Sequence, residues 1–540
     1  TVTPVSRRPA PNLTLARRKI TNIHKSSDNS HFFKNYSCES LLLSILSLTR
    51  LIRSITASYF EEGKAMKSYV ISGASALALV FTSGTALASD IYAGFPVTVK
   101  DYDGKKKTSV AYTGQIARHT LHDSLKKLAS SGNGAPNADL KAKMMAYFSG
   151  KDAGRAIIAP KTKGPFTIKQ TGVDDISKKK NLAGKTYKGT ITGMPNNMTG
   201  PELVTFWIDK ASAANKGYDA ANGYDYGQLI SKFIMGAVSY NQAVDNYLDE
   251  KLTAGKKPND KPYKKGAYYT GKEHSWDEAF GYFGAPAHTL SLTPRQVYEI
   301  AKQGKKSKDP KDALTFADFN KDGIVDLKTE MTFGPAYYAA AFDASGKGTK
   351  YLHNITKAFL DGRKLITSAK GAKLTDNQRS MLMSYADTIG KNWQTVLAEA
   401  VFKYAGSSYK DLAKLKTIIE AKGDTKKMLR KYVKHWGELK GFSLALQTGK
   451  ENLGDTATRL NRLIGFGPLM PNQSQVVDID SKGNFVRDQG AGMGEYMLHM
   501  LKVQKLMADK LDVKVRKNDM LKEMVGLSKK LGGSNTAEND

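Results

Sequence analysis

One stretch of the sequence carries oxygen-bearing side chains at the spacing of a calcium-binding loop. Residues 318–326 place such side chains at positions 1, 3, 5 and 9, and Gly323 stands at position 6, where the chain must turn sharply. Ile324 at position 7 offers its backbone carbonyl. Calcium takes about six to eight oxygen ligands, and this spacing is that of an EF-hand-type loop. The candidate side-chain ligands are Asp318, Asn320, Asp322 and Asp326.

The end of this loop departs from the EF-hand pattern. A bidentate Glu is expected at position 12, but Thr329 stands there and Glu330 follows it. A one-residue bulge would still deliver Glu330; otherwise Thr329 or water takes the place and the affinity falls. The alternative for the whole stretch is an Asx-rich turn that binds nothing. Residues 314–317 are short and show no clear helical pattern, so we expect an isolated calcium loop rather than a paired EF-hand.

Two similar segments carry a second set of candidate ligands. Residues 276–282 and 436–442 both read Trp-x-Glu-x-x-Gly-aromatic, with a histidine just before each tryptophan. This repetition suggests a bundle with pseudo-two-fold symmetry in which the two segments face each other. Such side chains suit iron or zinc held between helices, or acid–base chemistry. The alternative is a buried hydrogen-bonded network that locks helices together. The residues concerned are Glu273, His274, Asp277, Glu278, His435 and Glu438.

Other candidate chemistry is weaker. Residues 478–483 resemble a second calcium loop, but Lys482 stands where an acidic ligand is needed, so we expect a β-turn. The sequence has no H-E-x-x-H, no G-x-S-x-G and no phosphate-binding loop. Its single cysteine, Cys38, precedes the segment that we expect to be mature. We therefore expect a protein that is not an enzyme.

The start of the chain predicts export. Residues 1–65 are basic and patternless, and we interpret them as an over-extended reading frame, with a genuine N-terminal extension as the alternative. Met66 to Ala88 has a positive start, an apolar run and a small-x-small cleavage site, as a secretory signal peptide does. The run is too short for a membrane span, and no cysteine follows the cleavage site. We expect the periplasm or cell envelope, or secretion, and no lipoprotein anchor.

The charge supports the same localisation. The whole chain carries a net charge of +31, and the part after residue 88 keeps +24. The lysines are spread along the chain without an aromatic-interleaved basic motif. This pattern favours a solvated surface that attracts the anionic envelope over a nucleic-acid-binding protein.

Apolar periodicity predicts a mainly α fold: a large helical bundle with small β additions near its N-terminus. We expect one domain over residues 89–533, with a disordered tail over 534–540. A hairpin or extended arm is expected within 89–113, and a short hairpin near 185–191. Helices are expected from Gly114 to Leu128 and near 138–148, 202–214, 226–252, 294–303, 333–343, 350–365, 375–405, 409–421, 425–448, 492–512 and 517–531.

Four motifs, taken in order, resemble a bacterial exported family known as domain of unknown function 4856. They are residues 109–118, 273–284, the loop from Asp318, and residues 435–442. The resemblance implies an envelope protein with an EF-hand-like loop, and no established activity. The chain is also loosely similar to imelysin-type periplasmic bundles, which are linked to iron uptake. Their G-x-H-x-x-E motif is replaced here, with Lys272 for the Gly and Asp277 for the Glu.

Three functional hypotheses follow. The first is a non-enzymatic, exported helical protein in which calcium is structural, because extracellular calcium is abundant and the site need not switch. The second is an accessory protein of iron or haem acquisition that uses the His274/Glu278 and His435/Glu438 pairs. The third is a metal-dependent hydrolase built on the same residues. We expect a protein partner in the envelope or in an uptake system, and the oligomeric state stays open.

Overall fold

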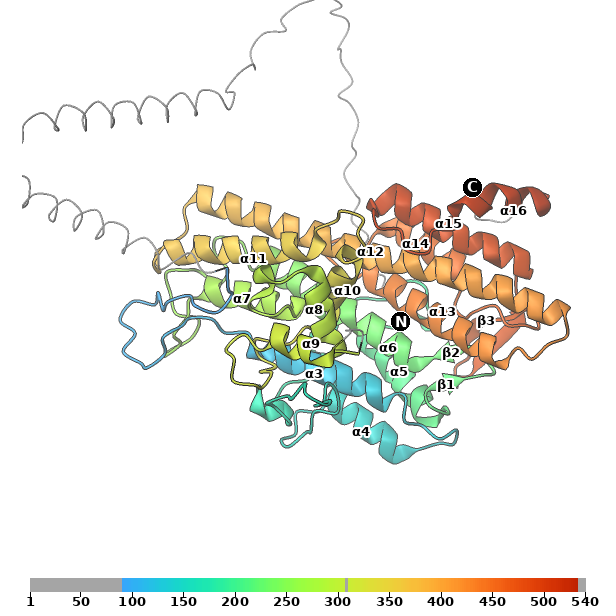
Figure 1. Cartoon of the computed structure of the whole chain (residues 1–540), viewed down its shortest axis with the longest axis horizontal. Helices are drawn as coiled ribbons and strands as arrows, with labels where there is room; N and C mark the ends of the chain where they lie inside the picture. The colour runs from blue at the N-terminus through green and yellow to red at the C-terminus, as the bar shows by residue number, and fades with distance from the viewer. Residues whose placement is uncertain (1–89, 306–308, 533–540) are drawn as a thin grey trace, which may run out of the picture. The chain divides into compact units, whose positions relative to one another are not determined.

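The computed structural model describes residues 90–305 and 309–532. A 45-residue helix, α12 (Asp376–Glu420), runs through this part of the structure (Figure 1). Thr375 and Gln378 start this helix with reciprocal side-chain-to-backbone hydrogen bonds of 3.2 and 2.9 Å. The segments 1–65, 66–88 and 534–540, for which the sequence predicted an extension, a signal peptide and a tail, lie outside the described residues.

The prediction of two helices, 375–405 and 409–421, was wrong, because α12 is continuous through both. Gly406, Ser407 and Ser408 resemble a loop in the sequence but are helical and packed. A Cβ on Gly406 would lie 2.0 Å from the Asn518 carbonyl oxygen, so only glycine allows this contact. Tertiary packing therefore overrides the weak helix propensity of these residues.

The other helices of the C-terminal half pack around α12. Helices α11, α13 and α15 contact it directly, and α14 packs against α13 and α15. Figure 1 shows α11 and α13 alongside α12, in yellow and orange. The sequence analysis missed α14 and placed a helix at 517–531, where only the second half is helical. The bounds are α11 (Tyr351–Ser368), α13 (Lys426–Leu446), α14 (Gly454–Ile464), α15 (Met493–Leu511), η8 (Leu521–Glu523) and α16 (Met524–Lys530).

The N-terminal half forms a second group of helices, joined to the first mainly where α6 packs on α13. The predicted helix at 226–252 is helical almost throughout, but its second part is π-helical. The bounds are α3 (Thr113–Leu128), α4 (Ala138–Phe148), α5 (Gly200–Ala213), α6 (Tyr226–Ile234), η5 (Met235–Tyr240), η6 (Gln242–Glu250), α7 (Gly271–Phe283), α8 (Pro294–Lys302), α9 (Pro310–Ala317) and α10 (Gly334–Asp343).

The mainly α fold class is confirmed, and β structure is confined to two small antiparallel sheets within the described residues. β1 (Tyr218–Asp219) pairs with β2 (Tyr224–Asp225), and β3 (Ser474–Ile479) pairs with β4 (Phe485–Gln489). The turn between β3 and β4 contains Asp480, which accepts hydrogen bonds from the amides of residues 482 and 484, as expected for a turn.

Both sheets lie far from the N-terminus of the described part. Residues 95–112 contain turns and bends but no strand, and the hairpin predicted near 185–191 is replaced by a short 3-10 turn, η3 (Ala183–Lys185).

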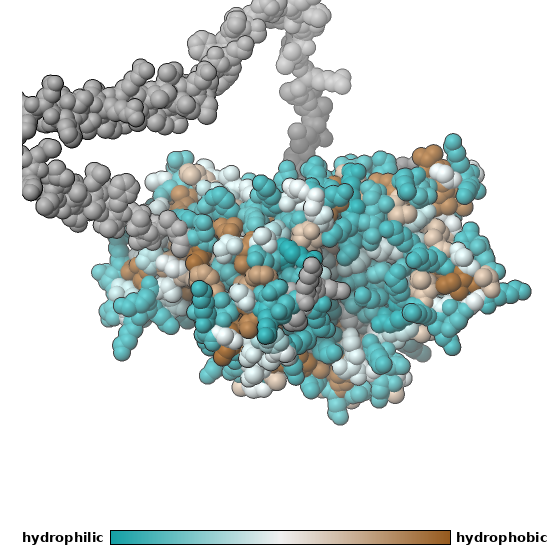
Figure 2. Space-filling model, in the orientation of Figure 1, coloured by the Kyte–Doolittle hydropathy of each residue, from teal (hydrophilic) through white to brown (hydrophobic). Residues whose placement is uncertain are grey.

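The surface is mainly hydrophilic, with small apolar patches scattered over the face that Figure 2 shows. None of the helices in the described ranges combines the length and the apolar character needed to cross a membrane.

One close helix contact in the core joins α7 to α11 through Trp276 and Gly362. The buried indole donates from Nε1 to the Phe359 carbonyl oxygen at 2.8 Å. A Cβ on Gly362 would lie 2.1 Å from Cζ2 of this indole. The glycine therefore sets how closely α11 approaches α7.

We expect Gly362→Ala to lower the free energy of unfolding by about 1–3 kcal/mol, because the added methyl group overpacks the contact with Trp276. Gly390→Ala on α12 is the matched control, since a Cβ there meets nothing within 4 Å. The control should be neutral or stabilise by up to about 1 kcal/mol. Urea unfolding measures both, and equal stabilities for the two variants would contradict this packing.

Candidate functional site

The loop that the sequence singled out, residues 318–330, begins where α9 ends. α9 contradicts the expectation that no helix precedes the loop. Asp309 caps it by accepting a hydrogen bond from the Lys311 amide at 2.8 Å, and a proline follows the cap. The helix has only eight residues, too few for a clear apolar period to show in the sequence.

The first half of the loop is a set of side-chain-to-backbone turns. Asp318 Oδ2 accepts from the Gly323 amide at 2.8 Å, and Asn320 Oδ1 accepts from the Asp322 amide at 2.9 Å. Asp322 Oδ1 accepts from the Ile324 amide at 3.0 Å. Gly323 has a φ of +81°, which disfavours residues with a side chain. The backbone therefore turns where the calcium-loop pattern requires it.

The loop is joined to a distant extended segment. The Val325 amide donates to the Thr167 carbonyl at 2.8 Å, and its carbonyl accepts from the Lys169 amide at 3.0 Å. Gln170 accepts from the Leu327 amide and donates to Asp326 Oδ1 at 2.7 Å. The loop thus pairs with residues 166–170, a partner that its own sequence does not indicate.

Glu330, rather than Thr329, turns its side chain into the loop. Oε1 accepts from the amides of Phe319 and Asn320 at 3.1 and 3.4 Å, and Oε2 accepts from the Asp326 amide at 2.6 Å. Burial is the main cause that raises the pKa of this carboxyl, and the backbone amides offset part of the effect. The side chain at position 13 therefore closes the loop, as the bulge alternative required.

The donor types of the loop fit calcium, because they are four carboxylates and one amide oxygen. As placed here, the carboxylates bond to loop amides. Lys169 Nζ also lies 3.7 Å from Asp326 Oδ2. Within the described residues, no three His, Cys, Asp or Glu side chains converge to hold a metal ion. The backbone turns at Gly323 and the Glu330 side chain folds back onto the loop, whereas convergence of the carboxylates on one point would need side-chain rotation.

Glu273 and Asp277 of the second candidate set face a buried arginine. Arg363 of α11 donates from Nη1 to Glu273 Oε1 at 3.0 Å and from Nε to Asp277 Oδ1 at 2.9 Å, and all three side chains are fully buried. Burial raises the pKa of Asp277 to about 6, although the guanidinium opposes this shift. Arg363 also donates to the hydroxyls of Ser109 and Thr367. The two carboxylates therefore belong to a structural ion network.

His274 and Glu278 lie on a different face of α7. Their side chains approach to 3.8 Å, and Glu278 accepts from Gln115 Nε2 at 2.7 Å. The imidazole stacks on Tyr269 with ring centroids 4.4 Å apart, and burial lowers its pKa. The ring is therefore held between aromatic and acidic neighbours of the N-terminal half.

His435 and Glu438 on α13 have other partners. His435 Nδ1 lies 2.6 Å from Asp411 Oδ2, and Glu438 Oε1 accepts from the Tyr404 hydroxyl at 3.0 Å. The candidate ligands on α7 and α13 thus bond to separate groups. This arrangement is that of hydrogen-bonded networks between helices, the alternative that the sequence left open. Arg363, Asp411 and Tyr404 carry no sequence signal that assigns them to these networks.

The comparisons with known proteins identify one part of the chain. Residues 101–309 match the family described as Domain of unknown function (DUF4856). The resemblance predicted from the sequence is confirmed over this range. Searches of curated proteins and of solved structures each gave no match. The likeness to imelysin-type proteins stays a prediction.

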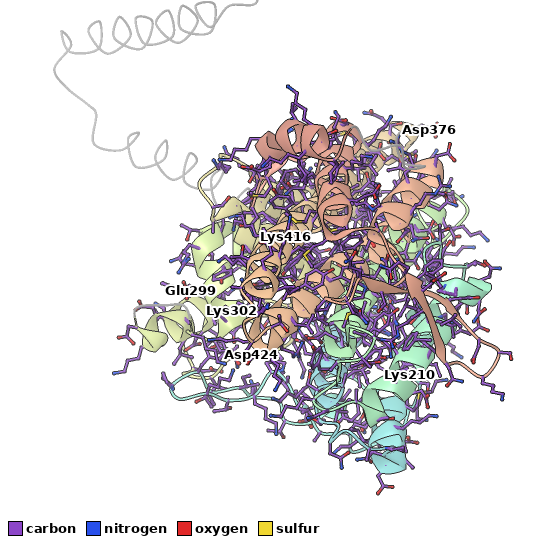
Figure 3. All side chains as sticks on the ribbon, turned by 90° about the vertical axis from the view of Figure 1, so that its right-hand side faces the viewer. Lys210, Glu299, Lys302, Asp376, Lys416 and Asp424 are labelled. Carbon is purple, nitrogen blue, oxygen red and sulfur yellow. The ribbon has the colours of Figure 1, made fainter. Side chains whose placement is uncertain are left out.

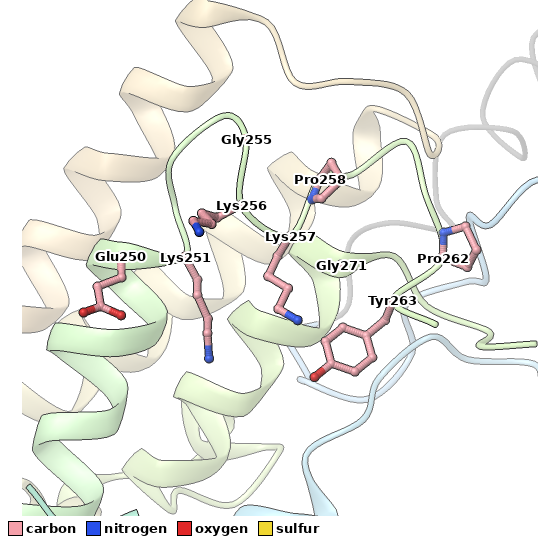
Figure 4. A pocket seen from close by; sticks show the side chains of 9 residues that line it. All are labelled: Glu250, Lys251, Gly255, Lys256, Lys257, Pro258, Pro262, Tyr263 and Gly271. Carbon is pink, nitrogen blue, oxygen red and sulfur yellow. The ribbon is translucent and has the colours of Figure 1, made fainter. Parts of the chain in front are cut away.

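The DUF4856 segment contains the helices from α3 to α8, including Glu273 and Asp277, and ends before the loop at 318–330. It also contains a surface cavity of about 540 Å³ beside the start of α7 (Figure 4). Tyr263 in its wall contacts the His274 ring edge-on at 4.4 Å, and Lys257 Nζ lies 4.2 Å from the Tyr263 ring centroid. Loop residues form most of this wall.

The Arg363 network that joins the DUF4856 segment to α11 can be tested directly. Arg363→Met should lower the free energy of unfolding by about 3–5 kcal/mol, because it leaves two buried carboxylates without a counter-ion. Lys357→Gln on the same helix is the matched control. Its pair with Asp361 is exposed, so the loss should be at most about 0.5 kcal/mol.

Chemical denaturation compares the two variants. Adding Asp277→Asn to Arg363→Met should restore part of the lost stability, since it removes one of the unpaired charges. Equal effects of Arg363→Met and Lys357→Gln would contradict a buried ion network.

Proposed function

We propose that this chain is a non-enzymatic binding or structural protein of the periplasm or cell envelope that is stabilised by calcium in the loop 318–330. The observation that carries the proposal is the preformed loop, in which Gly323 turns the chain and Glu330 folds back onto its first residues. The predicted signal peptide supports export to a compartment where calcium is abundant.

Calcium would stabilise the connections that the loop makes to the rest of the fold. Asp318, Asp322, Asp326 and Glu330 place four negative charges in one short stretch, and their mutual repulsion disfavours the closed loop. A bound cation removes that repulsion. The loop joins α9 to the segment that leads into α10, and Val325 pairs with residues 166–170. Fixing the loop would therefore fix three parts of the fold together.

The iron or haem hypothesis and the hydrolase hypothesis remain predictions without a structural observation in their favour. Both need the histidine–glutamate pairs of α7 and α13 to act on one ligand. These pairs bond instead to Tyr269, Gln115, Asp411 and Tyr404.

Calcium titration of the purified chain tests the proposal. We expect one calcium ion per chain by calorimetry and a higher melting temperature, with about 2.7 kcal/mol of added stability at a calcium concentration 100 times the Kd. Asp322→Ala should abolish both effects and should leave the fold intact, because Asp322 is exposed.

The matched control is Asp480→Ala, which removes the aspartate of the other Asx-type turn, between β3 and β4. This variant should bind calcium as the unmodified chain does. The same calcium content in the unmodified chain and in Asp322→Ala, or none in either, would overturn the calcium proposal.

The proposal also predicts a pH dependence. The raised pKa of Glu330 means that this carboxyl keeps its proton to a higher pH than an ordinary glutamate. Calcium requires the ionised form, so binding must release that proton and should weaken as the pH falls through the raised pKa. Glu330→Gln should bind more weakly and with a flatter pH profile. Kd values measured from about pH 5 to pH 8 check this, and identical profiles would exclude Glu330 as a ligand.

A further inference from the structure

A cavity of about 580 Å³ lies between the two groups of helices, walled by α3, α6, α8, α10, α12 and α13. Five lysines line it, against only two carboxylates, those of Asp123 and Glu438. We propose that this cavity binds a small organic anion that carries two or three negative charges as phosphate or carboxylate groups. The lysines are Lys126, Lys232, Lys302, Lys403 and Lys434.

Two other buried lysines of this protein have purely structural roles and serve as a comparison. Lys272 Nζ donates to three backbone carbonyls, those of Lys251, Thr253 and Lys256, at 2.7–3.2 Å. Lys440 Nζ donates to the Gly465 carbonyl at 2.7 Å and to Asn461 Oδ1 at 3.2 Å. Each of these ammonium groups is directed at fixed oxygen atoms of the protein. They stabilise loops and do not face a cavity.

Lys232 is placed differently. It is 4% exposed, and its Nζ lies 3.8 Å from Glu438 Oε1, which already accepts the Tyr404 hydroxyl proton. Its neighbour across the cavity wall is Lys126 of α3, another cation. Asp123 and Glu438 both lie near these two ammonium groups, and the other three lysines of the wall leave the cavity with an excess of positive charge. An anion bound in the cavity would therefore be strongly favoured.

The pKa values of the residues in the cavity wall agree with this excess of positive charge. The charge of Lys232, together with burial, lowers the pKa of Lys126 to about 7, and Asp123 and Glu438 only partly oppose the shift. Burial lowers the pKa of Lys403 to about 8; Lys517, Lys232 and Lys302 lower it further, whereas Glu438 raises it. Burial raises the pKa of Asp123 to about 6. A bound anion would relieve the cost of keeping the lysines charged.

Aromatic rings make the cavity suitable for an organic molecule. Lys302 Nζ lies 4.3 Å from the Tyr337 ring centroid, and Lys403 Nζ lies 4.5 Å from that of Tyr404. The Tyr338 and Tyr404 hydroxyls are 3.2 Å apart. These contacts hold the ammonium groups against ring faces, and the tyrosines of the lining give the cavity aromatic surface for the body of a ligand.

The inference does not depend on calcium, although the two sites are adjacent. Residues 331–334, which follow Glu330 directly, form part of the cavity wall. The charged groups of the cavity come from other elements. Anion binding can therefore be tested with and without added calcium, and its failure would leave the calcium proposal standing.

The test is calorimetric titration of the purified chain with two probes, phenyl phosphate and citrate, in about 0.15 M NaCl, which screens exposed charges. We expect saturable binding of one molecule per chain by at least one probe, and the stronger probe distinguishes phosphate from carboxylate recognition. Lys403→Gln should weaken binding at least tenfold. Lys416→Gln is the matched control, since Lys416 lies on the same helix at an exposed position (Figure 3) and should leave binding unchanged.

The pH dependence of binding gives a second measurement, which would not change if the lysines had only a structural role. Binding should weaken as the pH rises through about 7 and 8, where Lys126 and Lys403 lose their protons, and Lys126→Gln should remove the lower step. Melting curves of all variants show whether they fold. Lack of saturable binding of both probes, or equal affinities of Lys403→Gln and Lys416→Gln, would overturn the inference.

Discussion

The described fold depends on one buried cation between two buried anions. Arg363 of α11 bonds to Glu273 and Asp277 one helical turn apart on α7, and the same guanidinium reaches Ser109 in the extended segment before α3. Tyr92 donates to Asp277 from the beginning of that segment. Burying three charges is costly, and this cost offsets much of the free energy gained by pairing them. The pairing therefore contributes more to a unique arrangement of these elements than to the total stability. An arm without β pairing is thereby fixed to two helices.

Buried charged groups fix other non-helical segments in the same way. Glu399 on α12 accepts hydrogen bonds from the amides of residues 514, 515 and 516, which follow α15. Lys272 and Lys440 hold backbone carbonyls at two loops. In a protein with little sheet, these side chains satisfy backbone groups that strands would otherwise pair. Glu399, Lys272 and Lys440 are therefore explained by the loops that they anchor.

The two proposed sites occupy opposite ends of one short connection. Residues 331–334 run from Glu330 into the wall of the lysine-lined cavity, and Phe333 stacks on His119 of α3 with ring centroids 4.9 Å apart. The Phe333 amide donates to the Gly284 carbonyl at the end of α7. An ordered loop would thus support the packing of α3, α7 and α10 around the cavity.

The sequence by itself determined the local features. Apolar periodicity identified most helices. The helices expected from 294 and 375 begin at Pro294 and Asp376, where Thr293 and Thr375 cap them through local interactions. The spacing of acidic residues around Gly323 identified the turns of the loop for the same reason. The family resemblance was also readable, and the match over residues 101–309 confirms it for the range that holds the motifs at 109–118 and 273–284.

Only the tertiary structure decided which distant groups meet. Arg363 lies 90 residues from Glu273 in the sequence. Ile168, which bridges to Val325, also lies far from the loop in the sequence. The continuity of α12 through Gly406 depends on Asn518, and the lysine-lined cavity collects side chains from six helices. Single residue types and short spacings carry no information on such pairings. The free energy of burial and charge pairing, which selects them, depends on the folded arrangement as a whole.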